Sequence, residues 1–435
     1  MIKKGNQSRR ISSSDASKIQ YSVVRDRSWL VSQLLGSTHL RIFLHDYGGY
    51  AFTAQLGRAL AKKGHQVLYS YSLTTQLIQR FKLQPELDNF TIEGVSLPMP
   101  FTRYNYLRRW RDERVHGRKV AQQVRDFRPD VVLSANTPLD AQKLILNGSR
   151  EVGAKFIFWM QDAIGLATKN ALSYRYPIFG RLIGDLFIRL ERSLVSASDK
   201  VVVISDIFRD HLQEWGIDAA RTWVIPNWAP LDEIPIMAKD NRWTQSYDLK
   251  DKFVFLYSGV LGLKHDARLF IEMAQAFDQY PEVRIVVVAE GPFAESLKSE
   301  SEVKNLTNLV ILPYQPADDY PQMLACADVL MTILRTESSV YSVPSKVYTH
   351  MCAARPQLLS IPAGNPVAKL VTEQKMGLVS EPDDMHAWLE NAFALYQNRY
   401  NNQQMGMNAR AYAEENFDID IIVNEFEALM VRGHK

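Results

Sequence analysis

Hydrophobic and polar positions along the chain fall into a repeating strand-and-helix pattern that begins at Leu40. A short apolar run at 40–44 is followed by a loop at 45–49 and then by apolar residues at helical spacing through Leu60. Gly64 ends this predicted helix, since glycine is common just beyond helix C-termini. A second apolar run follows at 67–69. The strand–helix–strand order predicts a parallel sheet.

The same order occurs twice along the chain. It therefore predicts an α/β protein with two doubly wound, Rossmann-like domains. Further strands are expected at 131–133, 156–159, 201–204, 223–225, 253–257, 284–288, 309–312, 329–333 and 357–359. The predicted divisions are a basic, polar tail at 1–37, an N-terminal domain at 38–228, a linker at 229–251, a C-terminal domain at 252–415 and a helix at 416–435 that returns to the N-terminal domain.

Composition narrows the class of protein only slightly. Of 435 residues, 46% are hydrophobic and 23% charged, as in ordinary globular proteins. The net charge of +3 is too small to indicate nucleic acid as the main partner. Two cysteines, Cys326 and Cys352, suggest no disulfide framework, which favours a cytoplasmic location. The basic N-terminus is followed by serines rather than by the apolar segment of a secretory signal.

The predicted C-terminal domain offers two positively charged loops at helix entries. The first carries Gly259, Gly262 and Lys264 between a strand and a helix, where backbone amides and one lysine suit a diphosphate. The second is 343–348, in which Ser345 is expected to cap a helix and Lys346 lies in its first turn. A cation there opposes the helix dipole, so a bound phosphate would explain it. A surface lysine beside a turn remains the alternative for both.

Polar residues near these loops suggest contacts to a sugar. Glu337 and Ser339 lie just before the second loop and are expected to hold sugar hydroxyls, although alone they would indicate only a polar loop. In the N-terminal domain, Gly48 and Gly49 follow the first strand and form either a ligand-binding loop or a tight turn. Asp162 lies at the end of a predicted strand, and three roles are open for it. It could take a proton from the acceptor, hold a sugar hydroxyl or cap a helix.

The sequence gives weaker indications of a metal site or of membrane contact. Nine histidines are scattered, and Asp418 and Asp420 mark a helix start better than a metal site, so no metal is expected. Two stretches, 103–119 and 174–189, are basic and aromatic. They indicate either contact with an anionic membrane surface or a solvated basic face beside an amphipathic helix; the first is also a candidate for binding an acceptor pyrophosphate.

Taken together, these segments resemble family-four retaining glycosyltransferases with the GT-B fold, and most closely the colanic-acid and capsule-type exopolysaccharide enzymes. The resemblance is carried by 45–49, 158–162, 224–230, 256–264, 343–346 and 353–356. It implies sugar transfer from a nucleotide sugar bound in the C-terminal domain to a glycan or lipid-linked acceptor bound in the N-terminal domain. It also implies no cofactor or metal, a location in the cytoplasm at the inner face of the plasma membrane, and phosphate binding by Lys264.

The chain departs from the family pattern at three positions. The glutamate pair common in the family falls near Tyr341 and at Thr349, and the arginine that often precedes the phosphate lysine is absent. The family's cleft histidine falls near Gln161, which directs attention to Asp162. We therefore expect Asp162, Lys264 and Lys346 to be catalytic. Two alternatives remain: a nucleotide-sugar 2-epimerase, and a relative that binds a nucleotide sugar without turnover.

Overall fold

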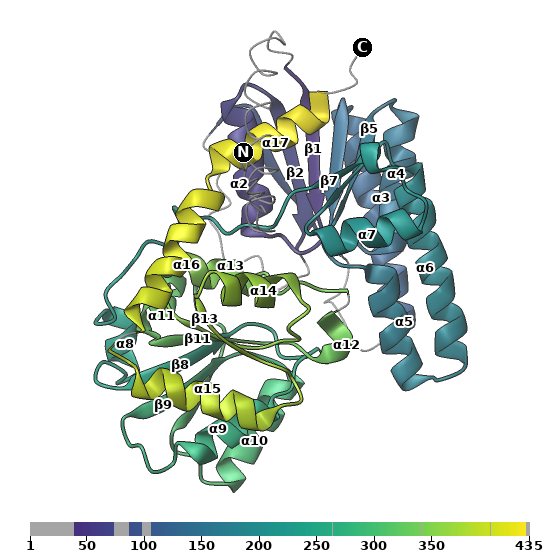
Figure 1. Cartoon of the computed structure of the whole chain (residues 1–435). Helices are drawn as coiled ribbons and strands as arrows, with labels where there is room; N and C mark the ends of the chain where they lie inside the picture. Colours follow the sequence, from purple (N-terminus) through teal and green to yellow (C-terminus); the bar gives the residue numbers. More distant parts are fainter. Residues whose placement is uncertain are drawn as a thin grey trace, which may run out of the picture.

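The structure is a computed structural model that describes residues 39–73, 87–97, 106–262, 264–339, 341–400 and 402–431. The predicted tail at 1–37, residues 103–105 of the first basic stretch, and Leu263 therefore lie outside the described residues. Figure 1 shows two α/β bodies, one above the other, joined by the linker and by the last helices.

Within the described residues, the N-terminal domain is built on a seven-stranded sheet with the order β3-β2-β1-β4-β5-β6-β7, and every pairing is parallel. Its central strands are buried apolar runs, which suits a sheet covered by helices on both faces. The strands are β1 (Arg41–Asp46), β2 (Gln66–Ser72), β3 (Phe90–Val95), β4 (Val131–Ala135), β5 (Lys155–Met160), β6 (Lys200–Val203) and β7 (Thr222–Val224). The helices are α2 (Ala51–Lys62), α3 (Tyr106–Phe127), α4 (Leu139–Glu151), α5 (Ile164–Arg175), α6 (Phe179–Ala197) and α7 (Asp206–Glu214), with the 3-10 turn η2 (Ala219–Arg221).

The C-terminal domain repeats this plan with a six-stranded parallel sheet in the order β10-β9-β8-β11-β12-β13. Its strands are β8 (Phe253–Ser258), β9 (Val283–Val288), β10 (Leu309–Leu312), β11 (Val329–Ile333), β12 (Gln357–Ser360) and β13 (Gly377–Ser380). Its helices are α8 (Arg242–Ser246), α9 (Arg268–Ala276), α10 (Pro292–Val303), η3 (Ala317–Asp319), α11 (Tyr320–Cys326), α12 (Thr336–Ser339), α13 (Lys346–Cys352), α14 (Pro366–Glu373), α15 (Met385–Gln397) and α16 (Gln403–Asn416).

The hydrophobic pattern did not predict two edge strands, β3 and β13. In β3 only the first and last residues are buried, because the strand lies at the sheet edge and one side of it carries polar residues. β13 has four residues and begins with Gly377, so it lacks both the length and the β-branched composition of a typical strand. Edge strands need less apolar surface than central ones, and for that reason their sequences carry a weaker signal.

The last helix, α17 (Ile419–Val431), crosses back and packs on the N-terminal domain, where Figure 1 shows it in yellow beside α2. Phe426 is fully buried, and its ring centroid lies 4.9 Å from that of Trp159 in a tilted contact. Glu427 binds Lys63 at 2.5 Å and His65 at 3.1 Å. Of the apolar residues of this helix, Ile421 is 37% exposed, whereas Ile422 and Leu429 are buried.

The strand order of each sheet indicates where that domain would bind a ligand. In both sheets the strand order reverses beside the first strand, between β1 and β4 and between β8 and β11. Ligands of doubly wound sheets bind beyond the carboxyl ends of the strands at such a reversal. The loops after β1, β5, β8 and β11 are therefore the place to look for a functional site.

Candidate active site

The glycine loop after β1 is fixed by a buried carboxylate that the sequence argument missed. Asp46, the last residue of β1, is fully buried and accepts hydrogen bonds from the Tyr69 hydroxyl at 2.7 Å, from the Gly49 amide and from the Tyr50 amide at 3.2 Å. Gly49 has a φ of 67°, in the left-handed region that glycine tolerates. Burial raises the pKa of Asp46 to about 6, and the hydrogen bonds from its neighbours oppose that rise. Gly48 and Gly49 thus form a pinned turn at the crevice.

The loop after β8 brings Lys264 and a neutral histidine together. The Gly262 amide donates a hydrogen bond to Nδ1 of His265 at 3.1 Å. Burial, together with the positive charges of Lys346, Lys264 and Arg335, lowers the pKa of His265 to about 3. Three cationic side chains therefore converge on one neutral imidazole at the carboxyl edge of the C-terminal sheet, which is an electropositive arrangement suited to an anion.

Lys346 begins helix α13, as the sequence predicted, and its side chain turns toward β8. Its Nζ lies 3.7 Å above the centroid of the Tyr257 ring. A Cβ on Gly259 would come within 2.8 Å of that Nζ, and Gly259 has a φ of 147°. The positive φ therefore favours glycine here, and its lack of a side chain also leaves room for the end of the lysine. Ser345 occupies the position before the helix but makes no side-chain capping bond, so the expected cap is wrong.

The two crevices meet across the domain interface. Asp162, just after β5, forms an antiparallel bridge with Ser342, and the Ala163 amide donates to the Tyr341 carbonyl at 3.1 Å. Lys264 Nζ donates to Ser342 Oγ at 3.1 Å and lies 3.7 Å from a carboxylate oxygen of Asp162. The predicted acid-base residue and the predicted phosphate lysine thus form an ion pair between domains. Helix capping by Asp162, the alternative that the sequence left open, is not observed, because no side chain of the preceding residues caps α5.

Two buried residues surround Asp162. Gln161 is 6% exposed, and its side-chain nitrogen finds no hydrogen-bond partner among the described residues. The N-terminus of α5 is instead bound by Glu191 of α6, which accepts from the Ile164 amide at 2.8 Å and the Gly165 amide at 2.9 Å. Burial raises the pKa of Glu191 to about 7, against the lowering effect of these amides. Sequence analysis did not identify this role, because Glu191 is distant from Asp162 along the chain.

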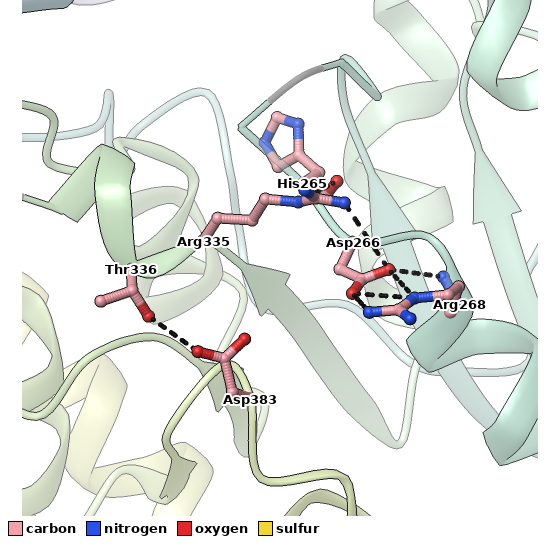
Figure 2. Close-up of polar contacts among 6 residues, drawn as sticks. All are labelled: His265, Asp266, Arg268, Arg335, Thr336 and Asp383. Carbon is pink, nitrogen blue, oxygen red and sulfur yellow. Dashed lines mark hydrogen bonds and ion pairs between the residues drawn. The ribbon is translucent and has the colours of Figure 1, made fainter. Parts of the chain in front are cut away.

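Arg335, at the end of β11, is a further cation that sequence analysis missed. Its amide donates to the Lys264 carbonyl at 2.8 Å and its Nε donates to the His265 carbonyl at 3.2 Å. Figure 2 shows its guanidinium reaching toward Asp266, which is 4.0 Å away and is also bound by Arg268. The C-terminal domain therefore carries an arginine beside Lys264, the predicted phosphate lysine, although it comes from the end of another strand and not from just before Lys264.

Glu337 and Ser339 lie on α12, beside this cationic cluster. Glu337 lines a small pocket of about 70 Å³ together with Asp266, Arg268, Leu269, Ile333, Leu334, Arg335, Ser360, Pro382 and Asp383. The far wall is tied to α12 by the Thr336 hydroxyl and Asp383, which Figure 2 shows joined by a dashed line. The Ser339 hydroxyl accepts a hydrogen bond from buried Asn365 at 3.0 Å. Asn365 also binds the Ser342 carbonyl at 3.2 Å, so it fixes the loop that meets Asp162.

Among the residues that the structure describes, no group of three or more His, Cys, Asp or Glu side chains is placed to hold a metal ion. Asp418 instead accepts from the Asp420 amide at 2.8 Å and begins α17. In the same part of the chain, no helix is both long and apolar enough to cross a membrane.

Comparison with known proteins agrees with this architecture. Residues 48–228 match the glycosyl transferase 4-like domain, and residues 252–398 match the glycosyl transferases group 1. Together the two matches support a family-four glycosyltransferase with the GT-B fold. Over 265 residues the chain is 23% identical to WbjE of Pseudomonas aeruginosa, a probable glycosyltransferase; the alignment covers 59% of this chain and 64% of that protein.

Solved structures share the fold at low identity. HepE of Anabaena in complex with UDP and glucose aligns with a TM-score of 0.68 at 16% identity, covering 91% of this chain and all of HepE. Sucrose-phosphate synthase of Thermosynechococcus elongatus aligns with a TM-score of 0.67 at 15% identity, covering 89% of this chain and 98% of the synthase. The overall fold is therefore GT-B, with its two sheets facing each other through their carboxyl ends.

Proposed function

We propose that the protein is a retaining, metal-independent glycosyltransferase that moves a sugar from a nucleotide sugar to a glycan or lipid-linked acceptor during exopolysaccharide or capsule synthesis. The reaction would take place in the cytoplasm, at the inner face of the plasma membrane. The observation that carries the proposal is the convergence of Lys264, Lys346 and Arg335 on His265, opposite Asp162. In HepE, a structural relative, crystals hold UDP-glucose, which supports a nucleotide-sugar donor here.

The cationic cluster fits the chemistry of the leaving group. A nucleoside diphosphate gains negative charge as its bond to the sugar breaks, and preorganised cations stabilise that charge. With Lys264 and Lys346 taking up the diphosphate, Asp162, which lies 3.7 Å from Lys264 Nζ, would stay beside the leaving group, on the face from which the acceptor must attack if the configuration is retained. Lys264 would then exchange its contact with Asp162 for one with phosphate, leaving the Asp162 carboxylate to accept the proton of the acceptor hydroxyl.

Donor specificity and stereochemistry can be tested separately. A panel of nucleotide sugars should raise the melting temperature only for the true donor, since ligand at 100 times its Kd adds about 2.7 kcal/mol. With that donor, NMR should show that the product linkage has the donor's anomeric configuration, and EDTA should not abolish transfer. An inverted linkage, or activity lost with EDTA and restored by a metal, would contradict the proposal.

The same donor panel decides between the proposal and its alternatives. A 2-epimerase would convert the nucleotide sugar itself in the absence of any acceptor. A non-catalytic relative would be stabilised by a donor yet transfer nothing to any acceptor supplied. Transfer that requires both an acceptor and an intact Asp162 would exclude both.

A further inference from the structure

The largest concentration of exposed apolar side chains in the described residues lies on the hairpin formed by α5 and α6. Tyr174 is 86% exposed, Ile178 73% and Phe179 72%, and Tyr176, Leu182, Ile183 and Leu186 are exposed as well. Monomeric soluble proteins rarely leave contiguous apolar patches in water unless the patch binds something. Figure 1 shows α5 and α6 side by side, running past the N-terminal sheet along the flank of the molecule.

The outward direction of this apolar face is set by two glycines on the other side of α6. A Cβ on Gly180 would meet the Leu172 carbonyl oxygen at 2.2 Å, and one on Gly184 would meet Cα of Lys169 at 2.5 Å. The two helices therefore touch backbone to backbone along the Gly180 and Gly184 side. Phe179, Leu182 and Leu186, at i, i+3 and i+7, must then point away from α5.

The charges on the hairpin favour an anionic partner. Residues 164–197 contain five basic side chains and two acidic ones. Of the acidic pair, Glu191 is fully buried, and Asp185 is bound by Lys169 at 2.7 Å. Arg181 and Arg189 are exposed; Arg181 lies beside the apolar stripe, and Arg189 lies at its C-terminal end, seven residues after Leu182. An apolar stripe edged by arginines matches the depth profile of a bilayer leaflet, with acyl chains inside and anionic head groups outside.

We propose that the α5–α6 hairpin docks on an anionic lipid surface, with Phe179, Leu182 and Leu186 in the leaflet and Arg181 and Arg189 at the head groups. This surface lies close to the proposed site, because α5 begins two residues after Asp162. Its twelve residues span about 18 Å. Docking would thus bring the polar end of a membrane-anchored acceptor to Asp162. The acceptor class, a lipid-linked saccharide, rests on the proposed function, whereas the docking itself does not.

Vesicle flotation tests the docking directly. The full chain should float with vesicles of phosphatidylethanolamine and phosphatidylglycerol and remain unbound with phosphatidylcholine alone. The apolar triple variant Phe179→Ser, Leu182→Ser, Leu186→Ser should lose binding. The double variant Arg181→Gln, Arg189→Gln should bind roughly 25-fold more weakly, at about fivefold for each arginine near the surface. Exposed residues of the C-terminal domain provide matched controls, Val303→Ser and the pair Arg242→Gln, Lys298→Gln, which should bind as the parent does.

Each outcome decides the proposal. It is overturned if the parent protein does not float with anionic vesicles, if the triple variant floats equally well, or if the hairpin variants instead abolish a concentration-dependent dimer seen by analytical ultracentrifugation. Far-ultraviolet circular dichroism and donor-induced thermal stabilisation confirm that the variants are folded. If vesicles bind through the hairpin but no saccharide acceptor is ever glycosylated, the docking holds and the proposed function fails. If the hairpin variants glycosylate a water-soluble acceptor normally but a vesicle-embedded one poorly, both hold.

Discussion

At the scale of single residues, the proposed donor site combines positive charge with a neutral imidazole. His265 stays uncharged because it is buried among Lys346, Lys264 and Arg335. A bound diphosphate would relieve the mutual repulsion of these cations, which the protein otherwise offsets with Asp162 and the Tyr257 ring. The cluster therefore favours binding of an anion and does not by itself stabilise the fold.

Removing either lysine tests this arrangement. Lys264→Ala and Lys346→Ala should each lower kcat/KM by roughly 10- to 150-fold, the value of one lost charge-assisted contact of about 1.5–3 kcal/mol. Lys298→Ala, an exposed lysine on α10, should change nothing. Steady-state kinetics with the identified donor measures all three. Near-normal turnover in either of the first two variants would show that its lysine is not part of the site.

The double variant asks whether both lysines act on the same phosphates. If they do, the loss in Lys264→Ala, Lys346→Ala should differ from the sum of the single losses, because residues that share a partner are not additive. Losses that add within error would place the two ammonium groups on separate parts of the donor.

Asp162 has a different expected signature, since we propose that it acts on the acceptor. Asp162→Asn keeps the shape but removes the charge, and we expect kcat to fall by about 10²- to 10⁴-fold if the carboxylate takes the acceptor's proton. Donor-induced thermal stabilisation should stay or increase, because Lys264 no longer has a competing anion. A fall in donor binding with unchanged kcat would instead assign Asp162 to the donor subsite.

At the scale of elements, the start of α5 connects Glu191, a buried carboxyl group, to the neighbourhood of Asp162. Glu191 caps α5 two residues beyond Asp162, and burial raises its pKa from an ordinary 4.5 to about 7. A raised pKa means that the folded protein holds this proton more tightly than the unfolded chain does. Between pH 4.5 and 7 the unfolded chain releases the proton first, so this group makes the free energy of unfolding fall as pH rises.

Glu191→Gln should remove that dependence. From pH 5 to 7.5 the free energy of unfolding should fall less in the variant than in the parent, by up to about 3 kcal/mol. Asp46, whose pKa is also raised by burial, titrates in the same direction in both proteins and cancels in the comparison. Urea unfolding at the two pH values measures the difference, and Glu302→Gln, an exposed glutamate on α10, is the control. Equal pH slopes in parent and Glu191→Gln would contradict the assignment.

A residue of the candidate site could be predicted from the sequence when its role depends on residues near it along the chain. Gly259, Lys264 and Lys346 could be placed from sequence because each lies at a helix entry that hydrophobic periodicity locates. Arg335 and Glu191 could not, because each acts through a loop or helix distant in sequence, brought near only by the sheet order. Asp46 contacts a loop next to it in sequence, but its burial and its bond to Tyr69 depend on the pairing of β1 with β2. The edge strands β3 and β13 were not predicted for a related reason. Their own residues have a weak strand pattern, and pairing with a neighbouring strand stabilises them.

At the scale of the whole molecule, the two domains are joined away from the site as well as at it. Residues on one face of the C-terminal sheet, such as Val254 and Leu256, belong to the same buried cluster as the N-terminal core, while Phe255 and Tyr257 face a second cluster. The alternation follows from the two-residue period of a strand. α17 completes this shared cluster by packing Phe426 against the stacked rings of Trp159 and Trp228.

The returning helix should therefore contribute to the stability of the domain that it joins, not merely end the chain. Phe426→Ala removes a fully buried ring from two tryptophans and should lower the free energy of unfolding by about 3–5 kcal/mol. Ile421→Ala changes the same helix at a side chain that is 37% exposed, and should cost no more than about 0.5 kcal/mol. Urea unfolding followed by tryptophan fluorescence reports on the affected region, because Phe426 packs against both Trp159 and Trp228. Because β5 carries Trp159 and ends just before Asp162, transfer activity should also fall in Phe426→Ala at temperatures where the protein is still folded. Equal, small effects of the two substitutions would mean that α17 only rests on the N-terminal domain and does not hold the site in place.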